Sequence, residues 1–277
     1  MLVVKVYGGL GNQIFQYVFG KYLEKKYNCE VKFDLHYYNI YNYRDPSILK
    51  LVKNIRTLND KNIYLKYNPT KSFRFNKIWN SIFNRKSYFT ENYDLNNLTS
   101  FVSNDILVYF DGYWQKSDYF SHFPCEIMRS NFNFTPAKFD CNNIKIHVRR
   151  GDYLSLSNCN IFHVQEPKYY IDALDYLFKT YRLDKQSINV LVYTDDPDWV
   201  KSNFNFQYSL EIESEIDDFI SLCTAKYLIT SNSTFSLAAA YLNSENNFVI
   251  TPKLWYKDIN KNQNHTSKLY LSKWKSI

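Results

Sequence analysis

The sequence predicts an α/β protein with parallel, doubly wound sheets in two Rossmann-like domains. Two observations support this fold class: apolar strands alternate with single helical segments, and several strands run directly into glycine, proline or N-cap residues that open a helix. The length of 277 residues is enough for two domains of ordinary size. A junction at residues 135–143, which contains Pro136, places an N-terminal domain at 1–138 and a C-terminal domain at 139–277.

The amino-terminal segment is typical of a strand, a glycine loop and a helix. Residues 2–7 are mostly apolar, Gly8-Gly-Leu-Gly11 follows, and apolar residues then recur at helical spacing. Ile14 stands where a dinucleotide fingerprint needs its third glycine, which argues against a nicotinamide or flavin site. Two interpretations stay open, a tight turn or a backbone that approaches a sugar or phosphate. Under the second, the binding residues are Gly9, Gly11, Asn12 and Gln13.

The rest of the first domain gives weaker signals. Periodicity is poor between residues 34 and 104, so the order of elements there stays open. Gly112-Tyr-Trp-Gln115 follows a strand, and Trp114 is either an aromatic platform for a sugar or part of the core. The expected elements are strands at 29–33 and 106–110 and helices near 46–52 and 73–83.

The most informative stretch is Ile144-Lys-Ile-His-Val-Arg-Arg-Gly-Asp-Tyr-Leu154. Apolar residues alternate with polar ones, so Lys145, His147 and Arg149 share one face of a strand. Gly151 lets the backbone turn sharply and leaves two arginines at the carboxyl end of the strand, where ligands bind in open α/β sheets. Adjacent guanidiniums repel unless an anion joins them, and a diphosphate suits two planar forks. The alternative is a solvated basic turn.

The second domain continues with alternating strands and helices. A helix opens at Pro167, Asp196 precedes Pro197 as an N-cap, and Ser214 to Asp217 has the spacing of a capping box. The expected elements are helices from Pro167, from Pro197, from Ser214 to Thr224 and at 235–242, and strands at 188–193, 227–229 and 248–250.

Four small polar residues, Ser231-Asn-Ser-Thr234, stand where a strand meets a helix. The first N–H groups of a helix are unpaired and its dipole is positive there, so an anion binds readily. Ordinary capping is the alternative, although one serine would be enough for it. Asp218 begins the preceding helix, where its carboxylate either accepts from a guanine edge or favours the helix dipole.

Composition sets limits without choosing a partner. The net charge of +7 suits a nucleotide, a nucleic acid or an anionic membrane, and the basic residues are scattered rather than clustered in a stripe. Five cysteines, an odd number without Cys-x-x-Cys spacing, indicate a reducing compartment. We find neither a signal peptide nor an apolar run of membrane-spanning length, so we expect a cytoplasmic protein.

Together the motifs resemble the α-1,2-fucosyltransferases, a family that includes many bacterial surface-polysaccharide enzymes. Leu237-Ala238 departs from the paired tryptophans that family members commonly carry after the serine motif. The matching segments, in the family's order, are Gly8–Tyr17, Gly112–Gln115, His147–Tyr153, Tyr193–Asp196 and Ser231–Ser236.

The resemblance implies a GT-B-type glycosyltransferase, with two Rossmann-like domains facing a cleft and the donor in the second domain. It implies GDP-β-L-fucose as donor substrate, inversion at the anomeric carbon, no metal and no cofactor. The usual acceptor is the 2-hydroxyl of a galactoside in a surface glycan such as an O-antigen. By the same resemblance, Arg149 binds the diphosphate, His147 and Asp218 bind the guanine, and Ser233 and Thr234 hold the β-phosphate. Arg150, Ser231 and Asn232 complete the expected donor site.

Several alternatives stay open. Asp152 is a catalytic candidate as the general base, but it also suits a salt bridge that orients Arg149 or Arg150; His163 and Glu166 are the other candidate bases. The donor could be another GDP-deoxyhexose such as GDP-colitose. A non-catalytic glycan-binding or nucleic-acid-binding protein is the alternative of another class, although we expect no nucleic-acid partner. The acceptor is either free or lipid-linked, and a lipid-linked one would bring peripheral contact with the inner membrane face.

Overall fold

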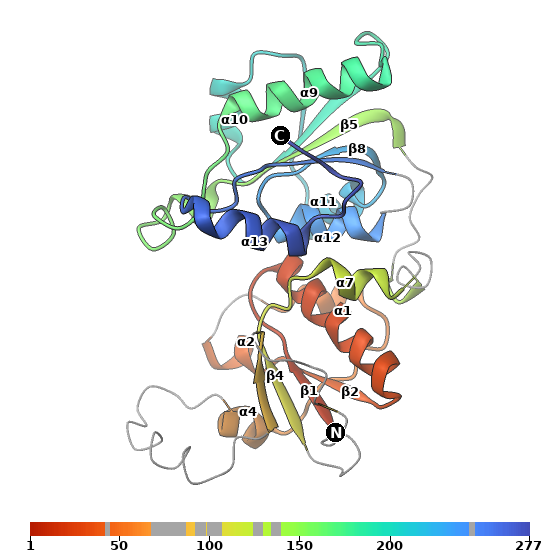
Figure 1. Cartoon of the computed structure of the whole chain (residues 1–277), viewed down its shortest axis with the longest axis vertical. Coiled ribbons are helices and arrows are strands. Elements are labelled where there is room, and N and C mark those ends of the chain that lie inside the picture. Colours follow the sequence, from red (N-terminus) through yellow and green to blue (C-terminus); the bar gives the residue numbers. More distant parts are fainter. Residues whose placement is uncertain are drawn as a thin grey trace. The chain divides into compact units, whose positions relative to one another are not determined.

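The computed structural model of the chain describes residues 1–41, 45–67, 87–91, 98, 107–123, 130–133, 140–243 and 247–277. These residues form two compact units, Met1–His122 and Phe123–Ile277 (Figure 1). Each unit has its own parallel sheet with helices, which confirms the predicted α/β class with two Rossmann-like domains. The expectation that the two domains face a cleft stays a prediction.

The boundary between the two units lies after His122, earlier than the predicted junction between residues 138 and 139. Part of the intervening segment, residues 124–129 and 134–139, lies outside the described residues. The helix expected at 73–83 also lies outside them. The boundary at 138/139 therefore stays a prediction.

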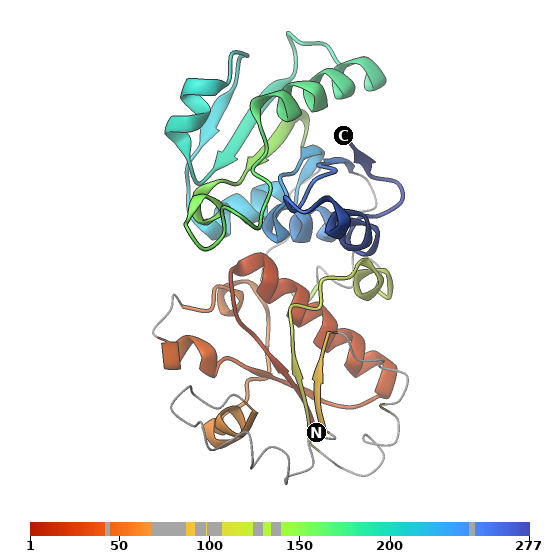
Figure 2. The same cartoon turned by 60° about the vertical axis from the view of Figure 1, so that its left-hand side comes forward.

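The first unit is a four-stranded parallel sheet in the order β2-β1-β4-β3. In the pictured views α1 and α7 cover one face of this sheet, while α2 and α4 lie on the other (Figure 2). Its strands are β1 (Leu2–Lys5), β2 (Val31–Asp34), β3 (Tyr88–Thr90) and β4 (Val108–Asp111). Its helices are α1 (Leu10–Tyr27), α2 (His36–Tyr41), α3 (Ile48–Leu51), α4 (Lys61–Tyr67) and α7 (Ser117–Ser121).

The second unit is a six-stranded parallel sheet in the order β10-β9-β8-β5-β6-β7. Helices α9 and α10 cover one face and α11 and α12 the other, so the sheet is doubly wound (Figures 1 and 2). Its strands are β5 (Asp140–Val148), β6 (Asn189–Thr194), β7 (Ser209–Glu211), β8 (Ala225–Ile229), β9 (Phe248–Thr251) and β10 (Lys275–Ser276). Its helices are α9 (Pro167–Tyr181), α10 (Pro197–Asn203), α11 (Glu215–Leu222), α12 (Thr234–Leu242) and α13 (Ile259–Leu269).

The predicted helix starts in this unit are confirmed by their caps. Asp196 accepts from the Trp199 N–H at 3.1 Å, and Ser214 accepts from the Asp217 N–H at 3.2 Å. Pro167 occupies the first position of α9. Sequence patterns missed β7, α13 and β10, because the two strands are very short and α13 buries few side chains.

Both faces of β5 are buried over its C-terminal half, from Ile144 to Val148. Ile144 and Ile146 lie in the apolar core that includes Tyr170 of α9. On the opposite face Lys145 and His147 are only 3% and 6% exposed. The alternation that predicted a strand is therefore confirmed, but helices cover its polar face as well, as is typical of parallel sheets.

Buried Lys145 is fully engaged by neighbouring polar groups. Its ammonium lies 3.2 Å from the Asp140 carboxylate. It also donates to the hydroxyls of Ser221 and Thr224, at 3.0 Å and 2.9 Å. These contacts connect β5 to the end of α11 and offset the cost of burying a charge.

Among the described residues, we find no helix that is both long enough and apolar enough to cross a membrane.

We predict that Lys145→Ala lowers the thermal midpoint of unfolding by roughly 5–10 °C, because Asp140, Ser221 and Thr224 would lose the buried ammonium that they contact. Lys168→Ala is the matched control, since Lys168 is exposed and pairs with Asp172 along one helix. It should shift the midpoint by only about 1–2 °C. Melting curves followed by circular dichroism measure both, and equal shifts would contradict the role given to Lys145.

Candidate active site

The two polar motifs of the second unit meet where the strand order of its sheet reverses. From β5 the chain proceeds outward through β6 and β7, whereas β8, β9 and β10 extend the sheet on the other side. Strands β5 and β8 are hydrogen-bonded neighbours, so their carboxyl ends form a topological switch point. Arg149 directly follows β5, and Ser231 is the second residue after β8. Ligands of doubly wound sheets bind in this position.

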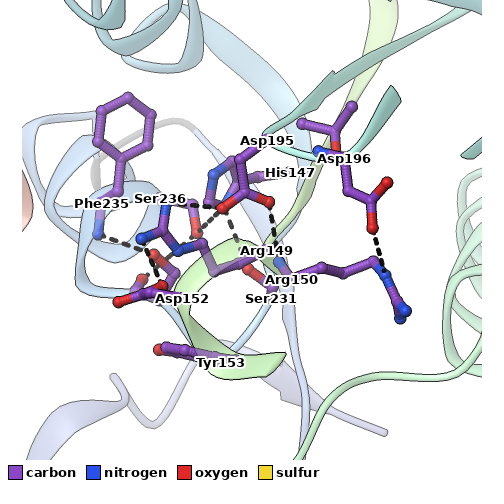
Figure 3. Close-up of polar contacts among 12 residues, drawn as sticks. His147, Arg149, Arg150, Asp152, Tyr153, Asp195, Asp196, Ser231, Phe235 and Ser236 are labelled. Atoms are coloured by element: carbon purple, nitrogen blue, oxygen red, sulfur yellow. Dashed lines mark hydrogen bonds and ion pairs between the residues drawn. The ribbon is translucent and has the colours of Figure 1, made fainter. Parts of the chain in front are cut away.

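Arg149 lies between two carboxylates. Its Nη2 is 2.6 Å from Asp152 Oδ1, and its Nη1 is 2.8 Å from Asp195 Oδ2 (Figure 3). The side chain is 32% exposed. The guanidinium is therefore held in place and still accessible to a ligand.

Arg150 makes different contacts. Its Nε lies 3.1 Å from Asp196 Oδ2, and its guanidinium stacks 4.0 Å above the ring of Trp199. Figure 3 shows the two arginine side chains pointing away from each other. In this structure the two guanidiniums have different carboxylate partners, Asp152 and Asp195 for Arg149 and Asp196 for Arg150, and joint binding of one anion stays a prediction.

Asp195 connects the two strand ends. Its Oδ1 accepts from the Arg150 backbone N–H at 2.9 Å, in addition to the Arg149 contact. A Cβ at Gly151 would lie 2.7 Å from Asp195 Oδ2. Gly151 is thus needed for the close approach of this carboxylate rather than for the sharp turn expected of it, since its φ is not positive.

Asp195 was not among the predicted site residues. The signal was present, because Asp195 and Asp196 end a strand as Arg149 and Arg150 do. The pairing of β5 with β6, with Val148 opposite Thr194, brings the two pairs together. The sequence alone did not reveal that these strands are neighbours.

Asp152 has the contact expected of an orienting residue. Its side chain is 56% exposed and its carboxylate engages Arg149. This is the salt bridge weighed against a role as general base. The structure brings Asp152 to Arg149 and not to Arg150, which engages Asp196 instead.

His147 is buried between β5 and the start of α12. Its Nδ1 lies 3.1 Å from the hydroxyl of Ser231 and 3.1 Å from that of Ser236. Burial, and secondarily the charge of Arg149, lowers the pKa of His147 to about 3. The imidazole is therefore neutral at working pH and forms hydrogen bonds without carrying charge.

Asn232 faces inward and holds two loops together. Its amide nitrogen donates to the carbonyls of His163 and Trp255, at 2.7 Å and 2.9 Å. Its Oδ1 accepts from Gln165 at 3.3 Å, and its backbone carbonyl accepts from the Tyr153 hydroxyl at 2.6 Å. With its amide occupied and fully buried, Asn232 acts as scaffold in this structure.

The serine motif thus divides into two halves. Ser231 and Asn232 make bonds inside the protein, whereas Ser233 caps α12 by accepting from the Phe235 N–H at 3.3 Å. Thr234 is the first residue of that helix and is half-buried. Of the four residues expected at the phosphate, Ser233 and Thr234 lie at the helix N-terminus itself.

Asp218 in α11 is a partly buried carboxylate. Its Oδ1 is shielded from solvent and has no hydrogen-bond partner among the described residues. Burial, together with repulsion from Glu213 and Asp217, raises the pKa of Asp218 to about 6. A buried acceptor without a donor is suited to a ligand that brings N–H groups.

The glycine loop lies in the first unit. The side-chain amides of Asn12 and Gln13, which follow it, form hydrogen bonds with other protein groups. Gln13 donates to the Gly8 carbonyl at 3.0 Å and accepts from the Ile48 N–H at 2.9 Å. Asn12 accepts from Gln115 at 2.9 Å. Gly8 has a positive φ of 82°, so it supplies the turn at the entry to α1. Gly9 is the N-cap of α1 and Gly11 is buried within it.

Trp114 belongs to the core of the first unit. It is 1% exposed and stacks on Phe19 with ring centroids 4.0 Å apart. Of the two interpretations of the Gly112–Gln115 segment, the structure therefore supports packing for this tryptophan.

The described residues contain no cluster of histidine, cysteine or carboxylate side chains suited to a metal ion. Asp196 and Asp198 have an Asp-x-Asp spacing, but both carboxylates have other partners. Asp196 caps α10 and binds Arg150, while Asp198 lies 3.6 Å from Lys201.

The model of glycosyl transferase family 11 matches residues 1–277. The chain belongs to glycosyl transferase family 11. This confirms the family resemblance and identifies the protein as a glycosyltransferase, which removes the support for a non-catalytic binding protein. Leu237 and Ala238, which depart from the pattern expected of the resemblance, are fully buried in α12.

Two curated Escherichia coli proteins are similar to this member of the family. The chain is 28% identical to an alpha-1,2-colitosyltransferase over 285 residues, which covers 93% of each protein. It is 32% identical to the O-antigen biosynthesis glycosyltransferase WbnK over 144 residues, or 49% of this chain and 44% of that protein.

Solved structures give weaker likenesses. A mutant of Arabidopsis thaliana FUT1 in complex with GDP has a TM-score of 0.49 at 13% identity, covering 90% of this chain and 69% of that one. The NodZ alpha-1,6-fucosyltransferase soaked with GDP-fucose has a TM-score of 0.44 at 12% identity, covering 87% and 91%. The two parallel α/β units of this glycosyltransferase agree with the GT-B class.

We predict that Gly151→Ala lowers kcat/KM of this glycosyltransferase by about 100-fold, because the new methyl group displaces Asp195 and shifts Arg149. Ser157→Ala, an exposed change in the following loop, is the control and should be neutral. Steady-state kinetics with a nucleotide-sugar donor measure the effect. Unchanged turnover in a folded Gly151→Ala protein would show that the approach of Asp195 is dispensable.

Proposed function

We propose that this enzyme transfers L-fucose, with inversion, from GDP-β-L-fucose to the 2-hydroxyl of a galactoside in a surface glycan such as an O-antigen. The observation that carries the proposal is the switch point of the second unit. There an accessible arginine at the end of β5 and the N-terminus of α12 flank the same sheet edge. Membership in glycosyl transferase family 11 supports a sugar nucleotide as the ligand.

The proposed chemistry depends on stabilising the departing GDP. As the bond to the anomeric carbon breaks, negative charge grows on the β-phosphate. The Arg149 guanidinium and the α12 N-terminus, with the hydroxyls of Ser233 and Thr234, are aimed at this charge. These groups would stabilise the leaving phosphate as a divalent cation does in metal-dependent enzymes. We therefore propose a metal-independent reaction without a cofactor.

Guanine recognition is assigned to Asp218 and His147. A guanine base presents two adjacent N–H donors, and the partly buried carboxylate of Asp218 faces them with an Oδ1 that has no partner among the described residues. His147 contributes a neutral imidazole, fixed by two serine hydroxyls. The ring of Phe235, 5.2 Å from that of His147, adds an apolar surface beside it.

Asp152 is assigned to positioning Arg149. Its carboxylate is already 2.6 Å from the guanidinium, so its charge supports the arginine instead of taking a proton from the acceptor. Another candidate base is His163, and burial lowers its pKa. The proposed transition state is dissociative, which reduces the demand for a strong base.

A second donor has specific support. The similarity to an alpha-1,2-colitosyltransferase extends over 93% of both proteins, so GDP-colitose is the alternative donor of the same site. Both donors present the same GDP to Arg149 and Asp218. The choice between them therefore needs a direct comparison.

We predict acceptor-dependent release of GDP from GDP-fucose with β-galactoside disaccharides, undiminished by EDTA. Arg149→Ala should reduce it by about 100- to 1,000-fold, because one preorganised donor to the leaving phosphate is lost. Lys168→Ala, on the exposed face of α9, is the control and should leave turnover unchanged. Release from GDP-colitose alone would change the donor, and dependence on added metal would remove the metal-independent mechanism.

We also predict that donor binding depends on the ionisation of Asp218. Below pH 6 the carboxyl is protonated in the free enzyme and has to lose a proton to accept two guanine N–H groups. Affinity for GDP-fucose should therefore fall about tenfold from pH 7 to pH 5. Isothermal titration calorimetry at the two pH values measures this affinity. Because the diphosphate diester of the donor does not titrate in this range, the change in affinity comes from the enzyme. Asp218→Asn should bind weakly with a flat pH profile; a wild-type slope in that variant would exclude Asp218.

A further inference from the structure

We propose that the second unit docks on an anionic lipid bilayer through one surface, which goes beyond the transfer reaction itself. Its apolar part consists of Leu154, Leu156, Ile161 and Ile259, here called the Leu156 patch. Leu156 is 96% exposed and Ile259 is 74% exposed. Within the described part of the second unit, five large apolar side chains are exposed, and four of them belong to this patch. Such a concentration is typical of a surface that another phase or molecule covers.

The patch comes from two segments that lie side by side. The Lys257 N–H donates to the Ile161 carbonyl at 3.0 Å, and the His163 N–H donates to the Trp255 carbonyl at 3.1 Å. Phe162 and Tyr256 form an antiparallel bridge between them. The loop after Asp152 and the start of α13 are therefore one continuous surface.

The apolar side chains are presented by an ordered loop. The Cys159 N–H donates to the Ser155 carbonyl at 2.8 Å, and the Ile161 N–H donates to the Asn158 carbonyl at 2.8 Å. Tyr153 and Phe162 stack at 4.4 Å at the base of the loop. With its backbone bonded internally, the loop holds its leucines outward instead of folding them into the core.

The positive charge beside the patch is the reason why we infer an anionic bilayer as its partner. Residues 253–273 contain five lysines and one aspartate, a net charge of +4 out of +7 for the whole chain. Lys257 and Lys261 are exposed beside the patch, and no carboxylate side chain follows Asp258. Exposed apolar side chains with two lysines beside them, on a segment of net positive charge, match a bilayer that offers hydrocarbon under anionic headgroups.

The position of the patch relates docking to the reaction. Its loop begins at Gly151, two residues after Arg149. Tyr153 at the base of the loop donates to Asn232 in the serine motif. A bilayer under this loop would keep the switch point of the second unit close to the headgroups, where a lipid-linked acceptor would be within reach.

The test is flotation of the whole enzyme with phosphatidylcholine vesicles that contain or lack phosphatidylglycerol. We expect the wild-type enzyme to float with the anionic vesicles. Leu156→Glu should weaken binding at least about tenfold, because it replaces an apolar side chain that would enter the bilayer with a charged one. Lys257→Glu should weaken it more than about fivefold, and only with anionic vesicles.

Two matched controls separate the patch from general charge and hydrophobicity. Ile212→Glu changes an exposed isoleucine outside the patch, and Lys179→Glu changes the net charge as Lys257→Glu does. Both should float like the wild type, and circular dichroism melting should show all variants folded. Patch variants should also keep turnover with a soluble disaccharide acceptor.

Three results would overturn the proposal: no flotation of the wild type, flotation of the patch variants equal to wild type, or equal losses in the control variants. If the patch variants float like the wild type but lose turnover with a soluble acceptor, the patch is an acceptor surface instead. Flotation is measured without any sugar nucleotide. A failed docking test is therefore distinguishable from a failed donor assignment.

Discussion

The pairing of two arginines with two aspartates across neighbouring strand ends is the constraint on which the rest of the site depends. Strands β5 and β6 run parallel and in register, so the pairs that follow them meet at one edge. Without the carboxylates, the adjacent guanidiniums would repel each other in a partly desolvated position. With them, Arg150 turns onto Trp199, while Arg149 stays accessible at the switch point.

Behind this edge, the sheet face toward α11 and α12 is polar and buried. Lys145 binds groups at the end of α11, and His147 binds two serines at the start of α12. A buried polar network tolerates little displacement, because an unsatisfied member costs more than an ordinary hydrogen bond contributes. The network therefore fixes the helix termini relative to β5, and with them the groups proposed to meet the donor.

Two residues expected at the donor, Gln13 and Asn232, use their side-chain amides inside the protein in this structure, and their role as ligands stays a prediction. Gln13 and Asn232 stand at strand-to-helix junctions, where backbone groups lack helical or sheet partners. Their amides satisfy carbonyls and N–H groups of neighbouring loops. A short polar residue at such a junction can serve either the backbone or a ligand.

The sequence by itself determined the alternation of strands and helices, the caps at Asp196 and Ser214, the start of α9 at Pro167, and the two polar motifs. Apolar periodicity and capping are local effects, set by residues within one or two turns. The sequence did not determine that Asp195 neutralises Arg149, that the two arginines diverge, or that Trp114 is core. It also missed α13, whose few buried side chains leave no apolar stripe. These features depend on strand order and burial, which are set by contacts between residues far apart in the chain.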